Sequence, residues 1–164
     1  MSKELGVGKM ITTKKSVNVS IFVCITVAVI LTALVFLGPK VFEFYMTAYR
    51  GFLPDGEALK MLKKTFAFCF YPSAFFSSVI LYSLLSLLLN IKKGDTFTRN
   101  NVLYLKTVSW CCFVIAVITF IGGFFYMPFI FVAAAGGFLG MLLRVLKNVM
   151  QSAVEIAEEN ELTI

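Results

Sequence analysis

Three long stretches without a charged residue constrain this chain more than any other feature. They cover residues 17–37, 66–89 and 107–143 and are 21, 24 and 37 residues long. An α-helix needs about 20 apolar residues to cross the hydrocarbon core of a bilayer. Of all 164 residues, 59% are hydrophobic and 15% are charged, whereas soluble domains average about 25% charged residues. We therefore predict an integral membrane protein, and this composition argues against both a disordered chain and a soluble enzyme.

The third stretch is too long for one crossing and has the right length for two. Gly122, Gly123 and Pro128 stand near its middle, and these residue types interrupt regular structure. Transmembrane β-strands would alternate polar and apolar residues, which these stretches do not. We predict an all-α integral membrane protein, a four-transmembrane-helix bundle whose spans cover about 17–37, 66–89, 107–125 and 127–146.

Lys and Arg residues predict the side of the membrane on which each connection lies, because cytoplasmic connections carry more of them. The N-terminal 16 residues, the connection at 90–106 and the tail at 147–164 contain ten, counting Arg144 at the edge of the last span. The connection at 38–64 contains five. This bias predicts a multi-pass protein with both termini in the cytoplasm. The first span is longer than the apolar core of a signal peptide, so we expect a retained anchor.

The connection at 38–64, which we expect outside the cell, is rich in aromatic residues. Tyr in particular favours the headgroup region of a membrane. Asp55 and Glu57 stand where an N-cap and a first-turn acid would start a helix that runs into the second span. Two interpretations remain open, an interfacial segment anchored by aromatic rings and an external ligand-binding surface.

The residue types that carry most catalysis are missing from the predicted spans. The chain has no histidine, and no carboxylate lies within a span. Histidine is the commonest general base and metal ligand, and proton-coupled transporters generally use intramembrane Asp, Glu or His. The four cysteines, Cys24, Cys69, Cys111 and Cys112, contain no C-x-x-C pair. We therefore expect no enzyme activity, no cofactor, no metal and no thiol chemistry.

Small residues recur in the fourth predicted span, at Ala133, Gly136, Gly137 and Gly140. Small residues four apart allow two helix backbones to approach closely in lipid. They indicate either packing within one bundle or the face of a homodimer. In the second span, Ser78, Tyr82 and Ser86 recur every four residues, and such hydroxyls usually hydrogen-bond a neighbouring helix or their own backbone.

The connection at 90–106 predicts a compact basic turn rather than a long loop. Gly94 suits the position just past a helix C-terminus, and Thr98 suits the N-cap of the third helix. Phe97 precedes that cap and could pack on Val102 as a hydrophobic staple. The alternative is that this segment is only a well-formed connection between two helices.

The tail at 147–164 predicts a cytoplasmic, amphipathic extension of the fourth helix. The apolar residues at helical spacing are Leu142, Val145, Leu146, Val149, Ala153 and Ile156. The end of the tail is acidic, which suits a protein partner better than an anionic membrane. The turn is basic and the tail acidic, so the two could fold together into one interface. We predict a partner-binding surface on turn and tail that consists of Lys92, Lys93, Gly94, Phe97, Thr98, Arg99, Asn101, Glu155, Glu158, Glu159, Asn160, Leu162 and Thr163.

Two segments of the sequence resemble a known family. Residues 91–102 (IKKGDTFTRNNV) resemble the second cytoplasmic connection of a bacterial four-span membrane family, and residues 155–164 (EIAEENELTI) resemble its C-terminal end. This is domain-of-unknown-function family 2975. The resemblance implies a non-enzymatic protein of the bacterial cytoplasmic (inner) membrane, often encoded beside a very small helix-turn-helix regulator. It supplies no catalytic residues.

Three functions from different classes are compatible with these observations. The first is a regulatory or stress-sensing partner of a small cytoplasmic DNA-binding regulator, with no direct nucleic-acid binding by this chain. The second is an immunity-type protein against a membrane-active peptide, suggested by the aromatic, basic external segment. The third is a small transporter or channel, suggested only by the hydroxyls of the second span. A neighbouring helix-turn-helix gene would favour the first and a bacteriocin gene the second.

Overall fold

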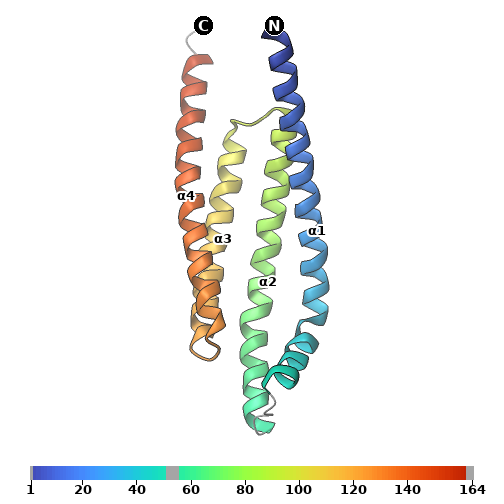
Figure 1. Ribbon diagram of the computed structural model, residues 1–164. Helices are drawn as coiled ribbons and strands as arrows, with labels where there is room; N and C mark the ends of the chain where they lie inside the picture. Colours follow the sequence, from blue (N-terminus) through green and yellow to red (C-terminus); the bar gives the residue numbers. More distant parts are fainter. Residues whose placement is uncertain (1, 51–55, 162–164) are drawn as a thin grey trace.

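Four long α-helices make up the described part of the computed structural model, which covers residues 2–50 and 56–161 (Figure 1). Within these ranges, the side chains of residues 2–15, 47, 49, 50, 58, 59 and 161 are not described. The helices are α1 (Ser2–Arg50), α2 (Gly56–Lys93), α3 (Arg99–Gly123) and α4 (Pro128–Glu161). The predicted all-α architecture is therefore confirmed.

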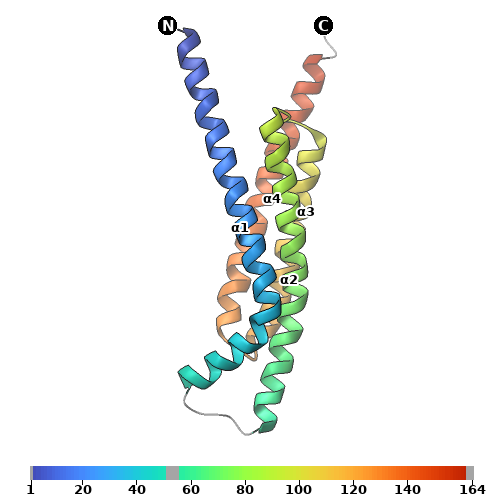
Figure 2. The same ribbon diagram turned by 90° about the vertical axis from the view of Figure 1, so that its right-hand side faces the viewer.

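The helices run antiparallel and pack in the order of the sequence. Close backbone contacts join α1 to α2, α2 to α3 and α3 to α4, and within the described ranges no other pair of helices makes them. The bundle is therefore open. Both termini and the α2–α3 connection lie at one end, which we call the terminal end, and the α3–α4 connection lies at the opposite end (Figure 1). Figure 2 shows the first half of α1 leaning away from the other helices.

All four helices are long and apolar enough to cross a membrane. The 34 residues of α4 extend for about 50 Å, whereas the hydrocarbon core is about 30 Å thick, so its charged end reaches beyond the core. Large apolar side chains such as Phe22, Phe36 and Phe131 are exposed on the surface of the protein. A surface of this kind suits lipid, because water would make its exposure costly.

The first helix continues past the predicted end of its span. Residues 38–50 were expected in a connection, but α1 runs without interruption through Pro39 to Arg50. Proline lacks the N–H that would bond to the carbonyl of Val35, so it bends a helix without necessarily ending it. Figure 2 shows the last part of α1 turning away from the rest of the helix. After an undescribed segment, α2 begins at Gly56 and continues directly into the second apolar stretch.

An aromatic cluster closes the opposite end of the bundle. Phe42 and Met46, one helical turn apart, are buried on the bent part of α1. The Phe42 ring stacks on that of Phe66 in α2, with 4.2 Å between centroids, and lies 6.4 Å from the Tyr126 ring. Phe66 and Tyr126 both lie near Phe129 of α4, at 6.4 and 5.5 Å. The part of α1 at residues 38–46 is thus packed on the bundle by one face.

The small residues of α4 form its contact with α3. Ala133 and Gly140 are buried, and the Ser109 hydroxyl on α3 donates a 2.8 Å hydrogen bond to the Gly140 carbonyl. A methyl group added at Gly136 would lie 3.5 Å from Ala116, and one at Gly140 would lie 3.3 Å from the Ser109 carbonyl oxygen. A methyl group at Gly137 would meet no atom within 4 Å. Packing within one chain therefore explains Ala133, Gly136 and Gly140, but it does not explain Gly137.

Candidate functional site

The turn that joins α2 to α3 begins with a regular helix C-cap. Gly94 has a φ of +100°, a conformation that favours glycine because it has no Cβ. The Gly94 N–H donates to the Ile91 carbonyl and the Asp95 N–H donates to the Asn90 carbonyl, both at 3.1 Å. These two bonds make a Schellman motif, which confirms the predicted role of Gly94.

Asn101 holds the turn together from the inside. Its side chain is fully buried, with 0% exposure, and its amide nitrogen donates to the carbonyls of Asp95 and Thr96 at 2.7 and 2.9 Å. Its amide oxygen accepts a 2.8 Å hydrogen bond from the Asn90 side chain at the end of α2. We expected Asn101 on a partner-binding surface, and this is wrong, because its side chain is buried and hydrogen-bonds within the connection.

The start of α3 differs from the predicted cap in its side chains. Thr98 takes the N-cap position, and its carbonyl accepts bonds from the N–H groups of Asn101 and Val102 at 3.0 and 3.3 Å. Its hydroxyl is buried and makes no hydrogen bond. Phe97 is exposed, so its ring is not buried in the expected staple on Val102. The backbone of Thr98 therefore starts the helix, and its side chain does not cap it.

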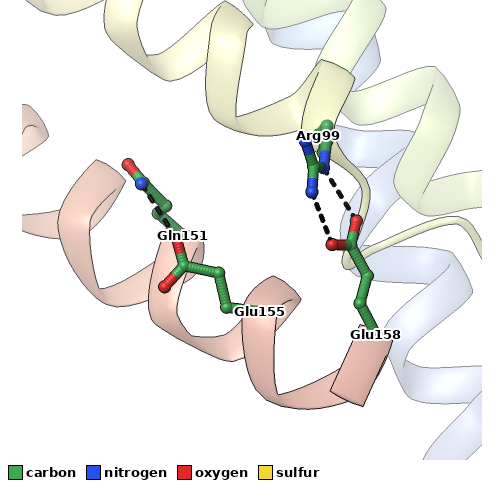
Figure 3. Close-up of polar contacts among 4 residues, drawn as sticks. All are labelled: Arg99, Gln151, Glu155 and Glu158. Atoms are coloured by element: carbon green, nitrogen blue, oxygen red, sulfur yellow. Dashed lines mark hydrogen bonds and ion pairs between the residues drawn. The ribbon is translucent and has the colours of Figure 1, made fainter. Parts of the chain in front are cut away.

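A two-point ion pair links this turn to the tail of α4. The Arg99 guanidinium donates to both carboxylate oxygens of Glu158 at 2.8 and 2.7 Å (Figure 3). The pair lies beyond the charge-free stretches, and both side chains remain accessible. Because the guanidinium hydrogen-bonds to it, the pKa of the Glu158 carboxyl lies below its usual range. Among the described residues, Arg99 and Glu158 make the ion pair between turn and tail, and Glu155 adds to the attraction on Arg99.

The other charged residues of the predicted surface are arranged differently. Glu155 accepts a 3.0 Å hydrogen bond from Gln151 one turn earlier on α4 (Figure 3). Lys92 and Lys93 are exposed at the end of α2, and Glu159 and Asn160 are exposed on α4. Leu162 and Thr163 lie outside the described residues. Of the predicted turn and tail residues that the structure describes, it therefore brings Arg99 and Glu158 together in an ion pair.

The tail has two apolar sides instead of the one predicted. Val154, which was not part of the predicted apolar set, is 4% exposed and faces α3. At 100° per residue, Val145, Val149 and Ile156 lie on the opposite side of the helix, and Val149 and Ile156 are 63% and 59% exposed. We call Val145, Val149 and Ile156 the outer stripe. The apolar periodicity predicted that the tail is helical. It did not predict which side of the helix is buried, because that depends on the position of α3.

A groove of about 420 Å³ separates α3 and α4 at the terminal end. It has basic, acidic and apolar walls, and its lining residues are Arg99, Val102, Leu103, Lys106, Lys147, Gln151, Val154 and Glu155. Within residues 2–50 and 56–161, no group of three His, Cys, Asp or Glu side chains could hold a metal ion.

Four membrane-length helices, exposed apolar side chains and charged helix ends define a multi-pass α-helical membrane protein. Residues 17–164 match the model of the family described as protein of unknown function (DUF2975), and the chain belongs to this family. This confirms the resemblance carried by the turn and the tail. Neither the curated proteins nor the solved structures contain a match.

Proposed function

We propose that this protein is a non-enzymatic membrane partner of a cytoplasmic regulator, and that it binds this regulator through the tail of α4. The observation that carries the proposal is the outer stripe. Val149 and Ile156 lie past the charge-free stretch and on the side of α4 turned away from α3. Exposed apolar residues at this spacing, seven apart on a helix, are typical of a surface that a partner helix covers.

The charges around the stripe favour a protein over the membrane surface. Glu155 and Glu159 are exposed on the same part of α4, and the anionic leaflet would repel them. The ion pair between Arg99 and Glu158 fixes the tail to the turn, so the outer stripe is presented by a supported helix. A supported surface loses less conformational entropy on binding than a free tail would.

Two observations indicate the kind of partner: the family resemblance and the excess of Lys and Arg at the terminal end. Ten of the 15 Lys and Arg residues belong to the terminal end, which supports a cytoplasmic location. A small helix-turn-helix regulator fits a role in which the membrane protein retains a transcription factor away from DNA. In this proposal, the bound regulator is released when the membrane protein responds to a signal or to stress.

The transport alternative receives little support from the second helix. A groove of about 690 Å³ runs between α1 and α2, and Thr32, Ser78 and Tyr82 are among its otherwise mostly apolar lining residues. The Ser78 and Thr32 hydroxyls donate to carbonyls of their own helices at 2.9 Å. Their hydroxyls are therefore committed to their own backbones, and they do not form a polar pathway.

The gene neighbourhood provides the candidate partner for a direct test. A small helix-turn-helix protein encoded there would be co-expressed with the full chain, and its share in the membrane fraction would be measured. The double variant Val149→Gln and Ile156→Gln should release most of it, whereas Ala157→Gln, at an exposed position of the same helix outside the outer stripe, should not. Membrane abundance of each variant serves as the control. A regulator that remains soluble beside the unchanged protein would contradict the proposal, and a bacteriocin gene in that place would favour the immunity alternative.

A further inference from the structure

A small basic pocket lies between α3 and α4, separate from the outer stripe. Its volume is about 170 Å³, and six residues line it: Lys106, Ser109, Trp110, Arg144, Lys147 and Asn148. Three of the six are cations and none is a carboxylate. No Asp or Glu in the described part of the chain forms an ion pair with Lys106, Arg144 or Lys147. The pocket therefore has an excess of positive charge.

The depth of this pocket follows from the sequence. Lys106 is the last charged residue before the stretch at 107–143, and Arg144 is the first after it. Because α3 and α4 are antiparallel neighbours, these two residues end the charge-free stretch at the same level. Trp110 lies one turn deeper, is exposed, and belongs to the residue type that favours the membrane interface. The pocket is thus placed where hydrocarbon gives way to headgroups.

The polar groups of the pocket leave its cations available. The Arg144 guanidinium lies 5.5 Å from the centre of the Trp110 ring, in a cation–π arrangement. Lys147 donates a 3.2 Å hydrogen bond to the Asn148 side chain, and the Ser109 hydroxyl bonds to the Gly140 carbonyl. These are contacts with neutral groups, and an anion would find three positive side chains around one concave site.

Apolar surface continues below the pocket toward the middle of the membrane. Val117 lies two turns beyond Trp110 on α3, and Met141 lies one turn before Arg144 on α4; both are exposed. Gly137 lies one turn before Met141 on α4, and a side chain at this position would meet no atom within 4 Å. A hydrocarbon chain could lie along this surface without displacing a side chain. Helix packing does not explain Gly137, but its lack of a side chain leaves room for such a hydrocarbon chain.

We propose that this pocket binds the phosphate headgroup of an anionic phospholipid, whose acyl chains lie along the surface below Trp110. Lys106, Arg144 and Lys147 provide the charge, because clustered cations between transmembrane helices attract anionic headgroups. The depth of the pocket and its continuation into apolar surface favour a lipid over a free anion. This site does not depend on the proposed regulator, since it uses the inner side of α4 and not the outer stripe.

Trp110 is the only tryptophan of the chain and reports on this site directly. Full-length protein would be placed in lipid nanodiscs with brominated phosphatidylglycerol or with brominated phosphatidylcholine of the same chains. Bromine quenches tryptophan fluorescence at short range, so the quenching at equal mole fractions gives the relative affinity. Each cation beside an anionic headgroup strengthens binding about fivefold. With three cations at the site, we expect phosphatidylglycerol to be preferred over phosphatidylcholine by much more than fivefold, with about 125-fold as the upper bound.

Two matched double variants locate the preference. Lys106→Gln with Lys147→Gln removes two charges from the pocket and keeps Arg144 beside the reporter, and the lipid preference should fall severalfold, toward the roughly fivefold value that one cation provides. Lys92→Gln with Lys93→Gln removes two exposed charges from the same end and should keep the preference. Equal quenching by both lipids in the unchanged protein would overturn the proposal, as would equal losses in the two variants. Relief of the quenching by inorganic phosphate at constant ionic strength would show a free-anion site instead.

Discussion

At the scale of single residues, the turn between α2 and α3 depends on two side chains that play opposite parts. Asn101 is buried with its hydrogen-bonding groups satisfied, while the Thr98 hydroxyl is buried without a partner. A buried polar group costs free energy unless it is paired, so removing these two groups should have different consequences. Thr98 and Asn101 are three residues apart, so variants of the two compare an unpaired with a paired buried polar group in the same turn.

Replacing Asn101 should destabilise the protein strongly. Asn101→Ala would leave the carbonyls of Asp95 and Thr96 and the Asn90 amide without their partner, at a cost of about 3 kcal/mol. Asn100→Ala removes a neighbouring exposed amide and should change the stability little. Unfolding of the detergent-solubilised variants measures both. Equal stability of the two variants would show that the buried network does not hold the turn.

Replacing Thr98 should have the opposite result to loss of a helix cap. A capping hydroxyl is worth about 1 kcal/mol, but Thr98→Val removes an unpaired hydroxyl and preserves the shape of the side chain. We expect unchanged or slightly higher stability in the same unfolding measurement. A loss of about 1 kcal/mol would mean that the hydroxyl caps α3 after all.

At the scale of helices, the sequence predicted the features that depend on local backbone geometry. It did not predict the features that depend on packing against neighbouring helices. Gly94 was predictable because a helix end needs a residue that tolerates positive φ. The continuation of α1 through Pro39 was not, because packing of Phe42 on Phe66 outweighs the usual effect of Gly and Pro. The buried side of the α4 tail was also missed, since Val154 and the outer stripe are equally apolar in the sequence.

The contact between α3 and α4 separates glycines that look alike in the sequence. Gly140→Leu would force a side chain against Ser109 and Phe113 and should cost about 1–3 kcal/mol through overpacking. Gly137→Leu points into open space and should leave the helix contact intact. Unfolding in detergent distinguishes the two variants. A larger loss for Gly137→Leu would mean that α4 uses its other face for packing.

At the scale of the whole molecule, the open arrangement separates two surfaces. The proposed lipid pocket lies between α3 and α4 at the end of the charge-free stretch, and the outer stripe lies on the far side of α4. Among the described helices, α1 makes close backbone contacts only with α2. The sequence predicted the four crossings because apolar length is a local property. It predicted an attraction between the basic turn and the acidic tail, but not the pocket or the pairing of Arg99 with Glu158 in particular, because both require the register between two helices.

We predict that the four helices cross the membrane with both termini and the α2–α3 turn facing the cytoplasm, as the apolar lengths and the basic bias of the terminal end indicate. The most direct test is cysteine labelling in intact cells, in a variant that lacks the four native cysteines. Single probes would replace Gly56 and Met127 near the opposite end, and Asp95 and Asn160 at the terminal end. A membrane-impermeant thiol reagent should modify the first two and spare the last two until the cells are opened. Labelling of Asp95→Cys and Asn160→Cys in intact cells, with protection of the other two, would contradict the account.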